Sequence, residues 1–299
     1  MTPLRLLCPV CRSPLTLGDA GASCVSCPRE FPVEGGILEL LTDRKGAPGY
    51  DPHYFESLSQ VEQTHFWYVA RRELILAIMR RTIPDLDRRA LFDIGCGSGG
   101  LLSFLGASGI AIAGAADAYR DGLRVARTRL GAPLILTDEG TLPPLGGGLG
   151  MVSLFDVLEH LDDDVGVLRF AHSVLEPGGY LVLTVPAHPF LFDEMDVLAF
   201  HRRRYRLGDL AEKLREAGLE VRALTHFMSP LVPGLLLVRA LGRLGRRPAA
   251  ERRNLELQVH PLLNPILLGL LRLERPVAER MRIPFGTSLI AVAERPRVV

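Results

Sequence analysis

Hydrophobic and polar positions from residue 90 onward follow two periods that alternate along the chain. Five short apolar runs come first, and they read ALFDIG, IAIAGAA, LILT, GMVSLF and YLVLTVP. Segments with helical spacing fall between and after them, near 99–108, 120–130, 163–176 and 207–217. Two further strands fit Leu219–Thr225 and Ser288–Glu294. Such alternation is typical of parallel strands joined by crossover helices. It predicts an α/β fold with a doubly wound, mostly parallel sheet of seven strands.

The segments outside this alternation divide the chain further. Apolar positions between 52 and 81 recur at helical spacing, which predicts one or two amphipathic helices ahead of the sheet. A long apolar stretch is inserted before the last strand. We therefore expect five parts: a small N-terminal ribbon over 1–45, a linker and helical cap over 46–89, a ligand-binding domain over 90–228, a helical insertion over 229–282, and a final strand within 283–299.

Four cysteines near the start of the chain form two closely spaced pairs, Cys8 with Cys11 and Cys24 with Cys27. Two such pairs let four thiolates meet at one tetrahedral site, and a module this small has too little core to fold without added free energy. The spacing predicts a structural zinc ion; a redox pair is the alternative. We expect the ribbon and the main domain to have separate cores, so that loss of zinc leaves ligand affinity intact.

A glycine-rich turn, LFDIGCGSGG, follows the first strand of the main domain. Gly95, Gly97 and Gly99 allow a tight turn and the close approach of a ligand. The same segment also fits the G-x-G-x-x-G pattern of a dinucleotide-binding oxidoreductase that uses NAD(P), so this remains an alternative. Asp93 argues against it, because a carboxylate there would repel a pyrophosphate but attract a positively charged ligand.

Further segments follow in a fixed order: DAYRDGLRVAR, DEGTLP, FDVLEHL and LEPGGYLVL. Together with the glycine turn they resemble the motifs of class I S-adenosylmethionine-dependent methyltransferases, which have a Rossmann-like fold. The resemblance implies that Asp93 and the glycines line the methionine end of the cofactor and that Asp117 holds its ribose. It places Asp138 and Glu139 beside the adenine, and Phe155 with Asp156 beside the sulfonium.

Other candidate residues lie before and after these motifs. HFWYVARREL resembles a cofactor-capping helix of some of these enzymes, which makes Trp67 and Arg71 candidate ligands of the cofactor carboxylate. Methyl transfer needs a base only where the acceptor must lose a proton. The candidate catalytic residues are His160, after the fourth strand, and His201 and Tyr205, in the H-x-R-R-Y string after the fifth.

Composition narrows the choice of acceptor. The chain has 35 basic and 34 acidic residues, so it lacks the basic excess of most nucleic-acid binders. The ribbon resembles small zinc-ribbon activators of methyltransferases and the fused ribbons of some ribosomal-RNA methyltransferases, which keeps ribosomal- or transfer-RNA base methylation as an alternative. A non-catalytic scaffold is another. The leading hypothesis is methyl transfer to a small or lipid-like acceptor.

The remaining expectations concern location. The chain starts without a signal-peptide pattern, which predicts a cytoplasmic protein. Apolar runs at 231–238 and 262–271 are too short to span a bilayer. Leu-rich segments followed by Arg239, Arg243, Arg246 and Arg247 suit a peripheral contact with the inner face of the membrane, whereas a lid or a dimer contact is the alternative.

Overall fold

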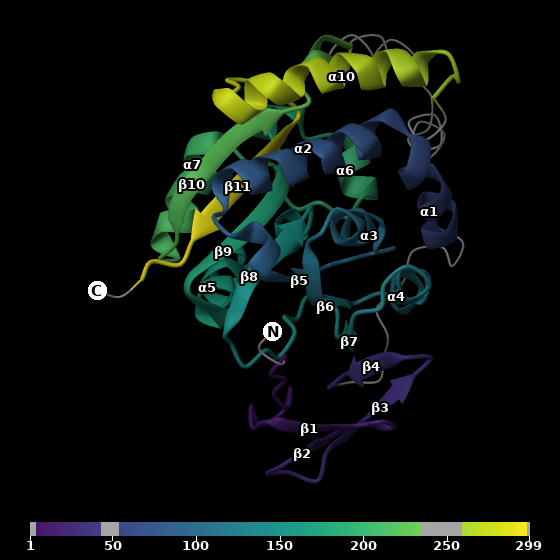
Figure 1. Cartoon of the computed structure of the whole chain (residues 1–299), viewed down its shortest axis with the longest axis vertical. Helices are drawn as coiled ribbons and strands as arrows, with labels where there is room; N and C mark the ends of the chain where they lie inside the picture. Colours follow the sequence, from purple (N-terminus) through teal and green to yellow (C-terminus); the bar gives the residue numbers. More distant parts are fainter. Residues whose placement is uncertain (1–3, 43–53, 235–258, 298–299) are drawn as a thin grey trace.

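The computed structural model describes residues 4–42, 54–234 and 259–297. One twisted sheet runs through the molecule, with the N-terminal strands at one end and a long C-terminal helix at the other (Figure 1). The four ribbon strands are β1 (Leu15–Gly18), β2 (Gly21–Cys24), β3 (Glu30–Glu34) and β4 (Ile37–Leu40). The seven strands of the main domain are β5 (Ala90–Ile94), β6 (Ala111–Asp117), β7 (Leu134–Thr137), β8 (Leu149–Phe155), β9 (Leu175–Pro186), β10 (Glu220–Phe227) and β11 (Ser288–Glu294).

Strand order confirms the predicted α/β fold. The order is β1-β2-β3-β4-β7-β6-β5-β8-β9-β11-β10, and the pairs from β4 to β9 are parallel. β11 is antiparallel to both of its neighbours. The order reverses at β5, whose neighbours β6 and β8 come from crossovers in opposite directions. In such sheets ligands bind outside the carboxyl ends of the strands, next to this reversal.

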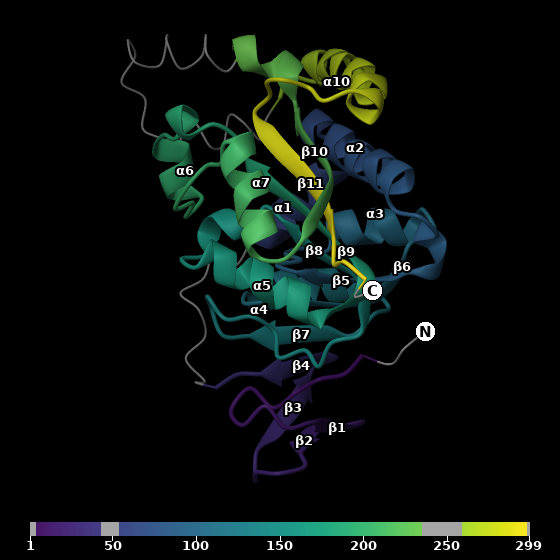
Figure 2. The same cartoon turned by 90° about the vertical axis from the view of Figure 1, so that its left-hand side faces the viewer.

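Helices cover both faces of the sheet (Figure 2). They are α1 (Tyr54–Thr64), α2 (Phe66–Thr82), α3 (Gly100–Ala107), α4 (Arg120–Arg127), α5 (Asp164–Val174), α6 (Glu194–Leu198), α7 (Leu207–Glu216) and α10 (Leu263–Arg280), with short 3-10 turns at Leu86–Arg88, Leu158–His160, Pro189–Leu191 and Ser229–Leu231. One apolar cluster contains the buried side chains of α5 and α7, and the other contains those of α2, α3, α4 and α10. Strands β5 to β9 contribute to both, as expected for a sheet buried on both faces.

The ribbon is part of the main core, so our expectation of separate cores is wrong. Leu38 and Leu40 of β4 belong to the same buried cluster as Phe92 of β5. β4 pairs with β7 in parallel, and Leu7 donates a backbone hydrogen bond to the carbonyl of Pro144 at 2.8 Å. The ribbon strands therefore extend the main sheet beyond β7.

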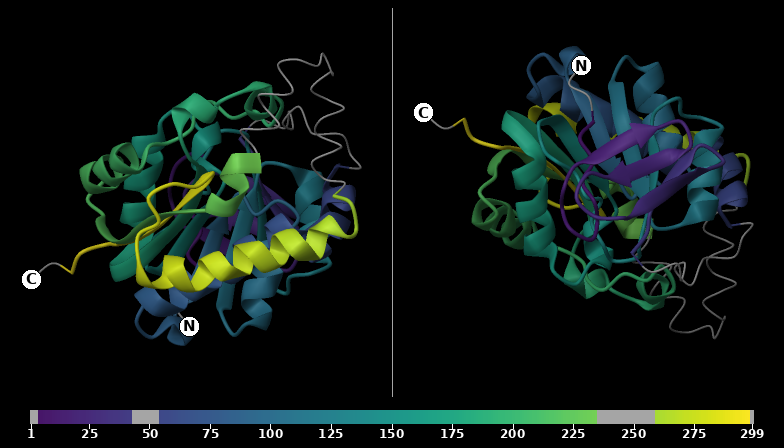
Figure 3. Two further views of the ribbon diagram at one scale, coloured as in Figure 1. Left: turned by 90° about the horizontal axis from the view of Figure 1, so that it is seen from above. Right: turned by 90° about the horizontal axis from the view of Figure 1, so that it is seen from below.

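α10 lies along α2 at the far end of the molecule (Figure 3). Arg272 bonds both carboxylate oxygens of Glu73 on α2, and the Asn264 side chain bonds the Thr64 carbonyl and the Phe66 amide. Residues 235–258, which include the four arginines singled out above, lie outside the described residues. Within the described ranges, no helix is both long and apolar enough to cross a bilayer.

Candidate cofactor and acceptor site

The glycine turn between β5 and α3 has the backbone shape that a close ligand requires. Gly95 has a φ of 82°, and a Cβ there would collide with Cγ2 of Val157, so another residue would clash as well as strain the backbone. Gly97 and Gly99 also have positive φ. Phe55 of α1 packs near Gly97, which places the N-terminal helix over the turn.

Two buried aspartates lie on either side of this turn. Asp93 in β5 is 2% exposed and bonds the Ser153 hydroxyl, and burial raises the pKa of Asp93 to about 7. Asp117 at the end of β6 accepts hydrogen bonds from the backbone N–H groups of Gly97 at 2.7 Å and Tyr119 at 2.8 Å. Burial raises the pKa of Asp117 as well. Each carboxylate oxygen has a second lone pair, so Asp117 can still accept from a ribose hydroxyl.

The segment that follows β4 of the ribbon contacts the carboxyl end of β7, next to this pair of aspartates. Asp138 follows β7, and its Oδ2 accepts from the Thr42 backbone N–H at 2.8 Å and the Thr42 hydroxyl at 2.5 Å. Glu139 accepts from the Tyr119 hydroxyl at 3.3 Å. Thr42 follows shortly after the parallel pairing of β4 with β7. Of the two residues expected at the adenine, Asp138 is thus held by the N-terminal module and Glu139 by Tyr119.

Arg71 of α2 lies 2.6 Å from the Asp156 carboxylate and donates to the Thr184 hydroxyl at 2.9 Å. Its guanidinium also lies 5.3 Å from the Trp67 ring centre and 5.9 Å from that of Phe155. Arg71 is buried, and its Nε has no hydrogen-bond partner among the described residues. The structure therefore places three other predicted residues, Trp67, Phe155 and Asp156, around Arg71, which keeps one unsatisfied donor.

A second group of side chains lies where the loop after β9 meets the short turn after β8. Single ligand atoms of Glu159, His160 and His201 all lie within 4.8 Å of one another. Glu159 is fully buried, and burial together with the nearby Asp156 raises its pKa well above the usual range. Burial and the neighbouring His201 lower the pKa of His160, so this imidazole is neutral at pH 7. Sequence reasoning chose the two histidines but missed Glu159.

Tyr205 has contacts that favour a structural role over the catalytic role we expected. It is 2% exposed, and its hydroxyl lies 3.1 Å from Oδ2 of Asp164 and 3.3 Å from the Leu158 carbonyl. Burial and the charge of Asp164 raise its pKa. A phenol that donates to buried acceptors and stays protonated is a poor base.

Three aromatic rings stack at the carboxyl end of β9. The His188 ring centre lies 4.9 Å from that of His226 and 4.1 Å from that of Phe285. Burial lowers the pKa of both histidines, which makes these rings neutral. Their Nε2 atoms are buried and have no hydrogen-bond partner in the part of the chain that the structure describes. His188 has a φ of 62°, a strained value for a non-glycine residue.

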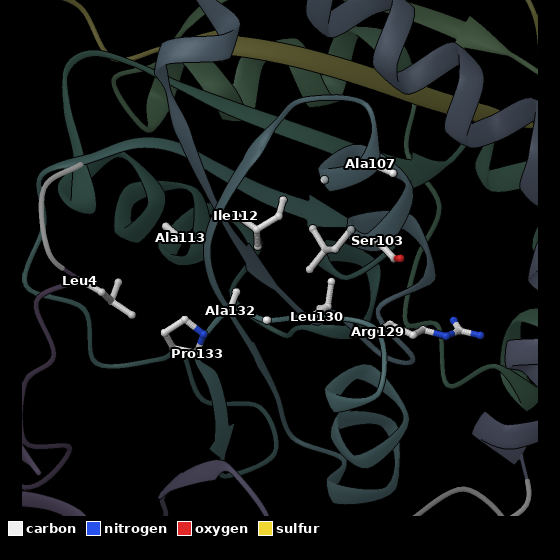
Figure 4. Close-up of a pocket in the computed structure, with 12 residues that line it drawn as sticks. Leu4, Ser103, Ala107, Ile112, Ala113, Arg129, Leu130, Ala132 and Pro133 are labelled. Carbon is white, nitrogen blue, oxygen red and sulfur yellow. The ribbon is translucent and has the colours of Figure 1, made fainter. Parts of the chain in front are cut away.

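A cavity of about 640 Å³ lies elsewhere, between α3 and the amino ends of β6 and β7 (Figure 4). Its lining includes Ser103, Ile112, Arg129 and Pro133. Ser103 lies on α3, Ile112 at the start of β6, and Arg129 and Pro133 before β7. The cavity is therefore separate from the glycine turn and the acidic residues.

The four ribbon cysteines have the arrangement expected for zinc. Their Sγ atoms lie within 4.8 Å of one another, with contacts of 3.4 Å between Cys11 and Cys24 and 3.7 Å between Cys8 and Cys27. A tetrahedral zinc ion with Zn–S bonds of about 2.3 Å separates its sulfurs by about 3.8 Å. The residues present fit such an ion.

Known methyltransferases match the part of the chain that contains the glycine turn and the acidic residues. The profile of a family described as "Methyltransferase domain" matches residues 66–224. A ubiquinone biosynthesis O-methyltransferase of Marinobacter nauticus is 33% identical over 163 residues, which cover 46% of this chain and 66% of that protein. The chain thus matches slightly less than two thirds of that relative.

Solved structures share the fold. One chain of a Haloferax volcanii complex, between the Trm112 methyltransferase activator and a putative methyltransferase, has a TM-score of 0.53 at 18% identity, covering 82% of this chain and 96% of that one. Haemonchus contortus phosphoethanolamine N-methyltransferase 2, in complex with S-adenosyl-L-methionine, has a TM-score of 0.53 at 16% identity, covering 83% of this chain and 58% of that one.

Proposed function

Because this chain belongs to the methyltransferase domain family, we propose that it is an S-adenosylmethionine-dependent methyltransferase and that it methylates a hydroxyl group of an aromatic, apolar acceptor. The M. nauticus relative is named for O-methylation in ubiquinone biosynthesis, which supports this class of acceptor. The observation that carries the proposal is the stack of neutral rings formed by His188, His226 and Phe285 at the carboxyl edge.

The residues at the carboxyl edge fit the cofactor, which supplies a methyl group already activated on a sulfonium. Asp117 would accept from the ribose hydroxyls, and Asp138 with Glu139 would border the adenine. The unpartnered Nε of Arg71 would donate to the cofactor carboxylate, Asp93 would line the methionine end, and Asp156 would lie near the sulfonium. The turn at Gly95, Gly97 and Gly99 leaves room for these contacts.

The acceptor side of the site is apolar and contains candidate bases. Of the three stacked rings, His226 is buried, whereas His188 and Phe285 are partly exposed and would stack on an aromatic acceptor. Offset stacking contributes about 0.5–1.5 kcal/mol beyond area burial. His160 is neutral, so it can take a hydroxyl proton. His201 lies beside it, with ring centres 5.0 Å apart.

α10 supports an acceptor that carries an apolar tail or resides in a membrane. Ile266 is 63% exposed and Leu273 is 71% exposed. The exposed apolar residues of this helix recur every three or four positions and so share one face: Leu263, Ile266, Leu270, Leu273 and Val277. This exposed face suits a peripheral contact with lipid.

The zinc in this proposal is structural. Four thiolates leave no open coordination position, so the ion would hold the ribbon together and, through Thr42, position Asp138.

The acceptor class can be tested with methyl-labelled cofactor and a panel of acceptors of matched size. We expect methyl ether products from a catechol or hydroquinone with an alkyl tail, fewer from the same ring without the tail, and none from an alkylamine. Mass spectrometry of the products measures this. Exclusive N-methylation, or turnover that ignores the tail, would contradict the proposal.

The cofactor site provides the control for this assay. Asp117→Ala removes the expected ribose acceptor and should weaken cofactor binding by about 1–3 kcal/mol, measured by titration calorimetry without acceptor. Unchanged affinity would remove Asp117 from the site. Vesicle flotation with anionic lipid tests the α10 contact separately, with Leu273→Glu expected to reduce flotation.

A further inference from the structure

Glu159 presents an unusual problem for a folded protein. Its side chain is fully buried, and neither carboxylate oxygen has a hydrogen-bond partner among residues 4–42, 54–234 and 259–297. A buried carboxyl group without a hydrogen-bond partner destabilises the fold even when it is neutral, and a charged one does so far more. Groups of this kind are usually paired with a cation or bound to a metal.

The two neighbouring histidines are oriented as metal ligands are. Nδ1 of His201 lies 2.8 Å from Oδ1 of Asp196, and Nδ1 of His160 lies 3.2 Å from the Phe200 carbonyl. A carbonyl or a carboxylate oxygen only accepts, so each Nδ1 carries the proton. Each Nε2 is then left with its lone pair. Metal-binding histidines typically donate their second nitrogen to a carboxylate or a carbonyl in this way.

The supporting contacts hold both loops in place. Asp196 is 1% exposed, and Arg204 donates to both of its oxygens at 2.8 and 2.9 Å. The Arg202 backbone N–H bonds the Glu159 carbonyl at 2.9 Å, and its side chain bonds the His160 carbonyl at 2.7 Å. The loop that carries His201 is thereby fixed to the turn that carries the other two residues.

We propose that Glu159, His160 and His201 bind a divalent cation such as Zn²⁺ or Mn²⁺ on the acceptor side of the site. Nε2 of His201 lies 3.9 Å from Oε1 of Glu159. Ligand atoms around one such ion lie about 3 Å apart, since metal–nitrogen and metal–oxygen bonds measure about 2.0–2.2 Å. Because the three ligand atoms lie within 4.8 Å of one another, the separations would have to shorten by less than about 2 Å to close the site.

The chemistry of these ligands distinguishes this site from the ribbon. Two imidazoles and one carboxylate suit several first-row metals and leave coordination positions open, whereas four thiolates favour zinc and close the site. Both histidines are half-buried, whereas Glu159 is fully buried. A cation there would occupy the lone pair of His160 and so replace His160 as the means of activating the acceptor: it would bind the acceptor hydroxyl and lower its pKa, with the proton passing to solvent water. This role rests on the proposed function; metal binding does not.

Manganese is the probe that separates the two sites, because thiolate clusters disfavour it. Zinc-loaded full-length protein is titrated with MnCl₂, and free Mn²⁺ is counted by electron paramagnetic resonance. We expect about one bound ion per chain. Glu159→Gln and His201→Ala should each weaken binding at least about tenfold, whereas His172→Ala on α5 should bind like the wild type.

The outcomes are distinct from those of the acceptor assay, because neither cofactor nor acceptor is present. Thermal unfolding of each variant separates lost ligands from lost fold, and Glu159→Gln should unfold no earlier than the wild type. If the wild type binds no Mn²⁺ and no second equivalent of zinc, the site does not exist. If both ligand variants bind Mn²⁺ like the wild type, the ion binds elsewhere and the assignment is wrong.

Discussion

The ribbon and the carboxyl edge of the sheet treat their polar groups in opposite ways. In the ribbon, four cysteines within twenty residues converge on one point, and β4 adds its backbone and its leucines to the main sheet. At the carboxyl edge, Glu159, Arg71, His188 and His226 each bury a polar atom that no other described residue satisfies. The first arrangement stabilises the fold. The second costs free energy of folding, because a buried polar atom without a partner is unfavourable.

The largest effect should come from the ribbon. Cys24→Ser removes one zinc ligand, and because the ribbon shares its core with β5, the loss should reach the whole domain. We expect the free energy of unfolding to fall by about 4 kcal/mol or more and cofactor affinity to fall with it, measured by urea unfolding and calorimetry. Ser23→Ala, at an exposed position of β2, is the control. A variant with a lower zinc content but wild-type stability would show that zinc binding by the ribbon contributes nothing to the stability of the domain.

A change of opposite sign is expected at the carboxyl edge. Burial raises the pKa of Asp93 from 3.8 to about 7, so the folded protein binds an extra proton between these values and loses stability as pH rises through this window. The side-chain amide of the Asp93→Asn variant would not titrate. As the pH is raised from 5 to 8, the free energy of unfolding of this variant should therefore increase by about 2–3 kcal/mol relative to that of the wild type.

Urea unfolding of the cofactor-free protein at both pH values measures this gain. Asp87→Asn, at an exposed position, should show none. A stability difference that stays constant with pH would contradict the prediction. It would mean that Asp93 ionises normally and that burying its charge does not destabilise the folded protein.

Tyr205 tests whether every buried polar group at this edge serves the reaction. Its hydroxyl is satisfied by Asp164 and Leu158, so Tyr205→Phe should cost about 1 kcal/mol of stability through the lost hydrogen bond. Turnover of a methyl acceptor should stay within about twofold of the wild type. A loss of turnover of about a hundredfold at unchanged stability would return Tyr205 to the catalytic residues.

The smallest effect is expected at the contact between the ribbon and the carboxyl edge. Thr42→Val removes the hydroxyl that bonds Asp138 but keeps the backbone N–H bond. Cofactor affinity should fall by about 1 kcal/mol, or roughly fivefold, while the zinc content stays at one per chain. Equal affinity in both proteins would mean that the ribbon stabilises the fold without positioning the adenine side.

Much of the fold could be predicted from local patterns. The apolar runs LILT and SLIAVAE became β7 and β11 with the expected bounds, and the spacing of Cys8, Cys11, Cys24 and Cys27 correctly predicted a cluster. These signals depend on neighbours in the sequence, so one chain is enough to read them. The parallel pairing of β4 with β7 has no such signal, since its partners are nearly a hundred residues apart.

The site followed the same division. The glycine turn and Asp117 could be predicted because they belong to contiguous motifs. Glu159 stood inside the motif FDVLEHL, yet its burial and its missing partners are tertiary facts. The ion pair between Arg71 and Asp156 likewise depends on how α2 packs against the sheet. No local pattern favours Asp156 over solvent as the partner of that arginine.

The pairing of β4 with β7 has a consequence for solubility. Without the ribbon, β7 would be the outermost strand of a parallel sheet and would present a row of open backbone N–H and C=O groups to other chains. Such edges are templates for aggregation. With the ribbon in place the outermost strand is β1, which has four residues and is paired on one side with the equally short β2. A short terminal strand is a poor template, so the N-terminal module also protects the enzyme against self-association through its sheet.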